Sequence, residues 1–184
     1  MRELRIVIAL LFVAMTTANA QVGNSFPMME GESLTNEMIN IPEDIKGKYS
    51  IIGLAYSKKS EDALKTWFEP AYYQFIHQPE KPSLFAGQYD VNVYFVPMFT
   101  GAKRPAYKAV MKKVKKSIDP KLLPYVLFYK GELKKYRKEL GFKGKDIPYF
   151  FVLDGEGKII YMTAGKYTDS KMREIADQVE DSWN

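Results

Sequence analysis

The sequence predicts an α/β domain whose largely parallel sheet is covered by helices on both faces and closed by an antiparallel hairpin. Short apolar runs typical of buried strands alternate with longer segments whose apolar residues recur at helical spacing. Strands that alternate with helices imply right-handed crossovers and parallel pairing. Near the C-terminus, two apolar runs are joined directly by the sequence Asp-Gly-Glu-Gly at 154–157, which is a strong hairpin signal.

The first twenty residues have the organisation of a secretory signal peptide. Arg2 and Arg5 precede an apolar run at 6–14, and the small residues at 16–20 match an A-x-A cleavage site. The apolar run is shorter than the roughly 20 residues of a membrane-spanning helix. We therefore expect cleavage between Ala20 and Gln21, followed by export to the bacterial periplasm or secretion, with no retained membrane anchor.

The remaining chain is predicted to hold an N-terminal extension at 21–48 and one domain at 49–184. The extension is polar and rich in turn residues, and we expect one short strand in it, at 33–39. The domain opens with an apolar run at 49–57 bounded by lysines, which is typical of a strand buried on both faces. Later apolar runs predict further strands at 91–98, 124–129, 148–153 and 158–164.

Four helices are predicted between and after these strands, at 60–75, 104–117, 132–140 and 169–182. The first begins at Ser60, whose hydroxyl is a suitable N-cap and is followed by two acids. Pro70 lies inside this helix and predicts a kink. The second helix carries an apolar stripe at i, i+3, i+4 and i+7 from Tyr107. Gly141 is suited to end the third.

The composition excludes several classes of function. The chain contains no cysteine and a single histidine, His77, which excludes thiol–disulfide exchange, Cys-based zinc sites and His-rich metal sites. No run of Asp and Asn has the spacing of a calcium loop. We expect neither a metal nor a cofactor. Aromatic residues form 14% of the chain and supply large side chains for a core without disulfides.

Residues in the second half of the chain resemble the thioredoxin-like superfamily, in its peroxiredoxin-like branch. They are Leu140-Gly141-Phe142, then Ile147-Pro148-Tyr149, and then the hairpin segment 151–159. Segments 63–70 and 125–165 together resemble the mitochondrial ATP synthase assembly factor family, whose members are thioredoxin-like without a redox cysteine pair. The resemblance implies a thioredoxin-like fold and an assembly role. The leader differs from that family and indicates a bacterial envelope instead of a mitochondrion.

The resemblance also places a site. In this superfamily the redox Cys-x-x-Cys lies where the first buried strand turns into its helix, facing a cis proline before the hairpin. Here that turn contains Tyr56, Ser57 and Ser60, opposite Ile147 and Pro148. A serine hydroxyl neither ionises near neutral pH nor forms a disulfide, whereas a thiol of pKa about 8.5 does. We interpret Ser60 as the N-cap and Ser57 as a strand-end hydroxyl.

Nucleophilic catalysis by these serines would require a neighbouring base, usually a histidine. His77 is predicted at the far end of the helix that Ser60 begins, about 20 Å or more away, and we expect it at the surface beside Pro79. Lys58 and Lys59 could act as a base or bind an anion, but solvated loop lysines are the better interpretation. An enzyme with unrecognised non-thiol chemistry is the weakest alternative, and would require a pocket with strongly shifted titrating groups.

The segment 103–145 is strongly basic. It contains fifteen lysines and arginines against Asp119, Glu132 and Glu139. The simplest interpretation is the solvated face of two amphipathic helices. The alternative is a basic surface that binds an acidic protein, anionic lipid or polyanionic glycan. Nucleic acid is not expected as a partner of an exported protein. The candidate residues for such a surface are Lys108, Lys112, Lys115, Lys134, Lys135 and Lys138.

The sequence therefore favours an exported, redox-inactive protein that acts by binding, as a scaffold or assembly factor for an envelope protein or peptide. The expected contact is the groove between the turn at Ser57 and Ser60 and the loop at Ile147 and Pro148, because related domains pair extended substrates beside that proline. The rival hypothesis is a protein that adsorbs to an anionic membrane surface or glycan through the basic segment.

Overall fold

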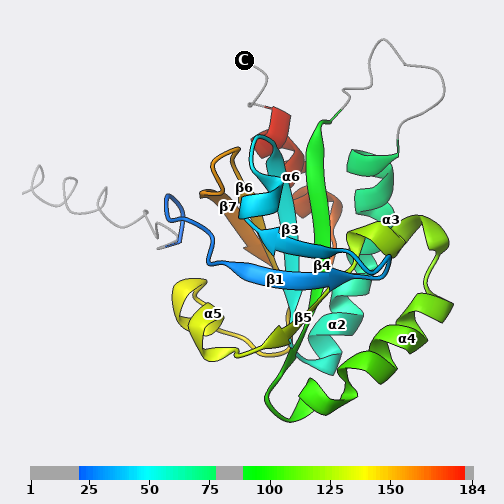
Figure 1. Ribbon diagram of the computed structural model, residues 1–184. Coiled ribbons are helices and arrows are strands. Elements are labelled where there is room, and N and C mark those ends of the chain that lie inside the picture. The colour runs from blue at the N-terminus through cyan, green and yellow to red at the C-terminus, as the bar shows by residue number, and fades with distance from the viewer. Residues whose placement is uncertain (1–20, 78–88, 181–184) are drawn as a thin grey trace, which may run out of the picture.

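A computed structural model describes residues 21–77 and 89–180. The predicted signal peptide, Pro79 and the end of the last predicted helix lie outside these residues. The described chain forms a seven-stranded mixed sheet with the strand order β2-β1-β5-β4-β3-β6-β7 (Figure 1). The strands are β1 Met29–Ser33, β2 Met38–Ile41, β3 Tyr49–Ala55, β4 Val91–Thr100, β5 Leu127–Gly131, β6 Tyr149–Leu153 and β7 Ile159–Ala164.

The centre of the sheet is parallel and its flanks are antiparallel. Strand β4 pairs in parallel with both β3 and β5, while β6 pairs antiparallel with β3 and with β7. The turn between β6 and β7 is fixed by Asp154, whose Oδ1 accepts the amides of Glu156 and Lys158 at 2.9 Å each. The predicted hairpin and the predicted parallel core are both confirmed.

The N-terminal extension differs from the prediction of one strand at 33–39. It forms a hairpin in which β1 and β2 pair antiparallel, and β1 also pairs antiparallel with β5. The turn of this hairpin falls within the predicted strand, where Asn36 has a φ of 70°. Asn is among the few residues that adopt this left-handed conformation readily. The polar residues at 35–37 therefore make a turn.

Five α-helices complete the described fold: α2 Lys58–Leu64, α3 Phe68–Ala71, α4 Tyr107–Ser117, α5 Lys134–Glu139 and α6 Asp169–Glu180. A 3₁₀ turn at Lys65–Trp67 separates α2 from α3, and a π-helical turn at Tyr72–Ile76 follows. Pro70 lacks an amide to donate one turn back, to residue 66. The α-helical hydrogen-bond pattern is interrupted one turn before the proline, at Lys65–Trp67. A 3₁₀ turn at Gly101–Ala106 leads into α4.

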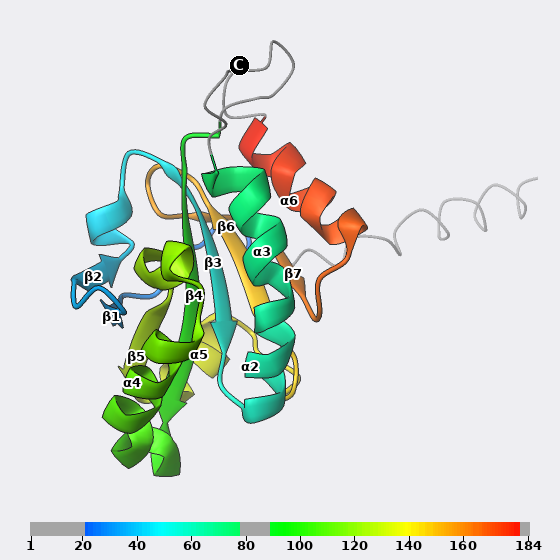
Figure 2. The same ribbon diagram turned by 90° about the vertical axis from the view of Figure 1, so that its right-hand side faces the viewer.

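Two apolar clusters hold the helices on opposite faces of the sheet. One cluster joins α2, α3, α4 and α6 to sheet residues such as Phe95 and Phe150, and Figure 2 looks onto this face. The other joins α5 and β1 to residues such as Leu54 and Phe151. Side chains that alternate along a strand point to opposite faces, so Phe150 and Phe151 lie in different clusters. The central strands are buried on both sides.

Candidate functional site

The turn between β3 and α2 is built around two buried serines. The Ser57 hydroxyl accepts the Ser60 amide at 3.0 Å, and the Ser60 hydroxyl accepts the Ser57 amide at 2.8 Å. This reciprocal pair is a capping box, which satisfies two amides that lack helical partners. The N-cap is therefore Ser57, and the assignment of Ser60 as N-cap was wrong. Ser60 occupies the third helical position and fills the role usually taken by Glu or Gln.

The Ser60 hydroxyl is fully used inside the turn. It also accepts the Tyr56 amide at 3.1 Å and donates to the Ser57 carbonyl at 3.0 Å, and the side chain is fully buried. The Ser57 hydroxyl donates to Asp146 Oδ1 at 3.0 Å. Ser60 Oγ is a second possible acceptor at 3.1 Å, but a carboxylate accepts more strongly. Among the described residues, the hydrogen bonds of the two serine hydroxyls involve backbone groups, each other and the Asp146 carboxylate, and no histidine or lysine.

The loop opposite this turn is anchored by aromatic side chains. The Phe142 ring is stacked between Tyr56 and Tyr149, with ring centroids 5.3 and 4.6 Å away. The hydroxyls of Tyr56 and Tyr149 both donate to the Gly144 carbonyl, at 2.8 and 2.9 Å. Burial, and then the neighbouring Tyr149, raise the pKa of the Tyr56 hydroxyl. It therefore stays protonated at physiological pH and keeps its hydrogen bond to the loop.

Ile147 and Pro148 close the loop, and they differ in exposure. The Ile147 side chain is 39% exposed, whereas Pro148 is buried and its carbonyl accepts the Gly165 amide at 2.9 Å. Within the described residues, the cis peptide precedes Pro42. The peptide before Pro148 is thus trans, unlike the cis proline of the superfamily. Its carbonyl is also occupied, so an added peptide strand has no partner at Pro148 itself.

The five candidate residues are brought together as the sequence predicts, but the space between them is filled. Tyr56 and Ser57 contact the loop directly, through Gly144 and Asp146. Sequence reasoning missed Asp146 and Phe142, which contact Ser57 and Tyr56 and so fill the space between the turn and the loop. Neither residue lies in a recognisable motif, and both are far along the chain from Ser57. The contact of Ser57 with Asp146 spans 89 positions.

The other charged candidates lie elsewhere. His77 is exposed after the π-helical turn, with its ring 5.9 Å from Tyr72 and 5.6 Å from Tyr73. Lys58 pairs with Asp62 across one helical turn at 2.8 Å, and Lys59 is exposed. In residues 21–77 and 89–180, no group of three or more acidic or histidine side chains is placed to hold a metal ion. No helix within those ranges is long and apolar enough to cross a membrane.

The six candidate lysines of the basic segment lie on two separate surfaces. All six are exposed. Helix α4 and helix α5 pack in different apolar clusters, on opposite faces of the sheet. Lys108, Lys112 and Lys115 therefore project from one side of the molecule and Lys134, Lys135 and Lys138 from the other. The basic stretch in the sequence is not one continuous patch in space.

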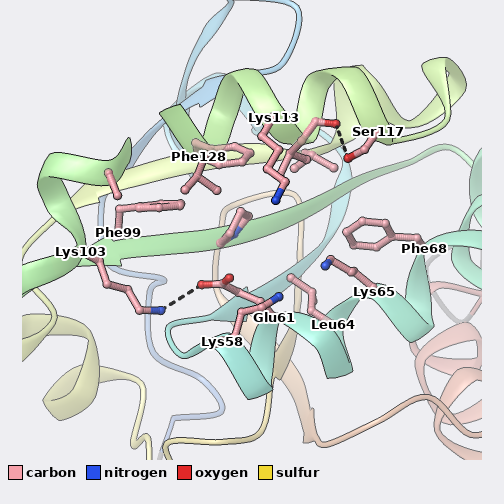
Figure 3. Close-up of a pocket in the computed structure, with 15 residues that line it drawn as sticks. Lys58, Glu61, Leu64, Lys65, Phe68, Phe99, Lys103, Lys113, Ser117 and Phe128 are labelled. Carbon is pink, nitrogen blue, oxygen red and sulfur yellow. Dashed lines mark hydrogen bonds and ion pairs between the residues drawn. The ribbon is translucent and has the colours of Figure 1, made fainter. Parts of the chain in front are cut away.

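A hollow of about 480 Å³ lies between α2–α3 and α4 (Figure 3). We name it the α2–α4 hollow. Its floor is formed by sheet side chains, and its walls by Leu64 and Phe68 on one side and Val110 and Val114 on the other. Four lysines surround this apolar surface: Lys58, Lys65, Lys103 and Lys113. No pattern in the sequence indicates this hollow, because the apolar positions of both helices suit ordinary core packing.

Comparison with known proteins identifies the family. The model of the ATP10 protein family matches residues 15–181 of the chain, which includes the whole of the described fold. The chain belongs to the ATP10 protein family. This is the assembly-factor family that the sequence resemblance indicates, and the absence of cysteine excludes thiol chemistry. No curated protein matches this ATP10-family chain by sequence.

Solved structures confirm the thioredoxin-like fold of this ATP10-family member. Yeast Sco1 has a TM-score of 0.51 at 15% identity, covering 89% of this chain and 97% of its own. A putative thiol:disulfide interchange protein DsbE from Chlorobium tepidum has a TM-score of 0.52 at 13% identity, covering 89% and 98%. BsSco, a member of the Sco family of cytochrome c oxidase assembly proteins, has a TM-score of 0.55 at 10% identity, covering 86% and 92%.

Proposed function

We propose that this ATP10-family chain is an exported assembly factor that acts by binding another envelope protein or peptide, with no redox step of its own. Family membership supports the assembly role. The absence of cysteine removes thiol chemistry. The proposed location rests on the leader, in which arginines, an apolar block and an A-x-A site follow one another.

The observation that carries this proposal is the internal use of both serine hydroxyls. In a thioredoxin-like fold this turn holds the reactive pair, and here Ser57 and Ser60 instead cap α2 and bind the loop through Asp146. Both serine side chains are buried, so their hydroxyls stabilise the scaffold and are not exposed to a substrate. This supports a structural role for the turn and, in our proposal, a function through surface recognition.

The surface beside this turn offers a contact for a partner. Lys145, Asp146 and Ile147 are consecutive and exposed, at the tip of a loop that Tyr56 and Tyr149 hold in place. Ile147 is one of few large apolar side chains exposed in the described chain. An apolar side chain flanked by charges on an anchored loop binds with little loss of conformational freedom. We assign the partner contact to this loop tip.

Site-specific photocrosslinking in the native envelope tests the assignment. A crosslinking amino acid at Ile147 should capture one discrete protein, and Ile147→Asp should abolish its recovery in a pull-down. Met28 is the matched control, because its side chain is also apolar and is 61% exposed. Equal capture from both positions, or unchanged recovery with Ile147→Asp, would contradict a partner site at the loop.

Export has its own experiment. Fractionation of cells expressing the tagged full chain should place the protein outside the cytoplasm, and mass spectrometry should find Gln21 as the first residue. Replacing Leu10 and Leu11 in the apolar block by Asp should hold the precursor in the cytoplasm, since the apolar core of a signal is what the export machinery recognises. An uncleaved protein in the cytoplasm would overturn the envelope assignment.

A second candidate function, adsorption to an anionic surface, is favoured by helix α4. Its eleven residues include five lysines and no acid, and each lysine near an anionic membrane contributes about 1 kcal/mol. Co-sedimentation with vesicles containing anionic lipid measures this. Replacing Lys112, Lys115 and Lys116 by Gln should reduce binding at low salt, whereas the same change at Lys134, Lys135 and Lys138 on the opposite face is the control. If both triple variants lost vesicle binding equally, binding would depend only on the net charge of the protein and not on α4.

A further inference from the structure

We infer that the α2–α4 hollow is a binding site for a single-chain amphiphile with an acidic head, namely a long-chain carboxylate. The shape of the hollow suits such a ligand. The hollow lies between two helical walls and reaches the sheet, where its floor is made by Pro97 and Phe99 on β4 and by Val126 and Phe128 at β5. Phe99, Val126 and Phe128 are buried core residues, whereas Pro97 in the floor and Phe68, Val110 and Val114 in the walls are only partly buried. An apolar ligand would gain contact with these partly buried side chains.

The volume selects the kind of occupant. Ligand sites in proteins usually measure about 300–1,000 Å³, and this one measures about 480 Å³. An extended hydrocarbon chain fits within this volume. A chain lying along α4 from Val110 to Ser117 would run about 10 Å, the rise of two helical turns.

Charge complementarity selects the head group. Figure 3 shows Lys65 from the α2 side and Lys113 from α4 directed into the same space. Lys103 is held by Glu61 at 3.1 Å, and Lys58 and Lys65 share Asp62 at 2.8 and 3.2 Å. Four ammonium groups thus face two carboxylates, which leaves two positive charges over an apolar floor. A neutral lipid would leave these charges unmatched.

The existing ion pairs do not prevent this recognition. Lys58, Lys65 and Asp62 are each more than half exposed, and exposed pairs of this kind contribute only about 0–1 kcal/mol. A ligand carboxylate can therefore recruit Lys65 at small cost. Lys113 is exposed on α4 and can reach the same head group from the opposite wall, so that the two helices share one anion.

Isothermal titration calorimetry of the purified protein with dodecanoate, below its micelle concentration, tests the inference. Dodecanoate should bind at one site, while dodecanol and butyrate, which lack the charge and the chain respectively, should bind at least about tenfold more weakly. Lys65→Glu with Lys113→Glu should lose about tenfold or more in affinity for the same reason. Lys59→Glu with Lys143→Glu is the matched control, because both lysines are exposed, both lie outside the lining, and the change in net charge is the same.

A second variant separates the hollow from general surface charge. Val114→Trp should fill the space and abolish dodecanoate binding while the lysines stay in place, with circular dichroism and thermal unfolding confirming that it folds. Dodecanoate that binds this variant as well as the wild type would overturn the site, as would dodecanol binding as tightly as dodecanoate. Absence of binding together with a dimer in analytical ultracentrifugation would assign the hollow to a second copy and overturn the ligand. The partner contact at Ile147 does not depend on these results.

Discussion

Ser57 and Asp146 are joined side chain to side chain across the turn that precedes α2, with Ser57 Oγ 3.0 Å from Asp146 Oδ1. The same Ser57 oxygen accepts the Ser60 amide at the start of the helix. One hydroxyl therefore couples the start of the helix to the loop that carries Ile147. This arrangement ties the stability of the loop to the helix cap.

The first prediction is that the contributions of Ser57 and Asp146 to stability are not additive. Ser57→Ala removes a cap worth about 1 kcal/mol and a hydrogen bond worth about 0.5–1.5 kcal/mol, so we expect a total loss of about 2 kcal/mol. Asp146→Ala should cost about 1 kcal/mol, and the double variant less than the sum of the two. Urea denaturation of all four proteins gives the coupling energy. If the losses of the two single variants added up exactly to the loss of the double variant, the hydrogen bond between Ser57 and Asp146 would contribute nothing to stability.

The second prediction restores the missing chemistry. Ser57 Oγ and Ser60 Oγ lie 3.1 Å apart, so cysteines at both positions should form a disulfide on mild oxidation and release two thiols on reduction. The helix N-terminus should lower the pKa of the thiol at position 57 from the usual value of about 8.5, while the Asp146 carboxylate opposes this effect, so the pKa should fall further when Asp146→Asn is added. Thiol counting and a pH titration of alkylation rates measure both effects. Each single cysteine variant is the control, and a double variant that resists oxidation would show that the turn no longer has the superfamily geometry.

Patterns of short range in the sequence were sufficient for most of the fold. The run from Tyr49 to Ala55 is apolar at consecutive positions because β3 is buried on both faces, and the stripe from Tyr107 marks the buried side of α4. The hairpin between β6 and β7 depends on a turn only four residues long. In each case the residues that determine the structure are neighbours in the sequence, so the local pattern is enough to predict it.

The errors arose where the cause is tertiary or where two local solutions compete. Ser57 and Ser60 both have hydroxyls at positions suited to a cap, and burial of Ser60 against the Tyr56 and Ser57 amides decides between them. The predicted strand at 33–39 contains the turn at 34–37, because β1 and β2 pair with each other on either side of it. No charge pattern reveals that α4 and α5 lie on opposite faces, since this depends on how each crossover connects its strands.

The third prediction concerns Gly53, in the middle of β3. A Cβ at this position would lie 2.6 Å from the Phe150 ring and 3.0 Å from Leu64, closer than packed atoms tolerate. Gly53→Ala should therefore destabilise the protein by about 1–3 kcal/mol, the usual cost of overpacking. Chemical denaturation measures it, with Gly155→Ala as control because its Cβ would find its nearest neighbour at 3.6 Å. The same unfolding midpoint for both variants would contradict the close contact.

The last prediction is an acid-dependent loss of stability at Glu32. Lys108 donates to its two oxygens at 3.0 and 2.8 Å, and the Tyr107 hydroxyl donates to it at 2.8 Å. The hydrogen bond from Lys108, and to a smaller extent that from Tyr107, lower the pKa of the Glu32 carboxyl from its usual 4.5, against the opposing effect of burial.

Because the folded state has the lower pKa at Glu32, its contribution to stability is complete above about pH 4.5 and is lost as the pH falls through the folded value. Glu32→Gln keeps the shape of the side chain and removes the titration. We expect the melting temperature of the wild type to exceed that of Glu32→Gln at pH 7 and the difference to shrink steadily below pH 4.5. Glu37→Gln, at an exposed position in the adjacent turn, provides the control. A difference that is constant from pH 7 to pH 3 would mean that the lysine and tyrosine bonds do not favour the ionised carboxylate, and that Glu32 joins β1 to α4 by shape alone.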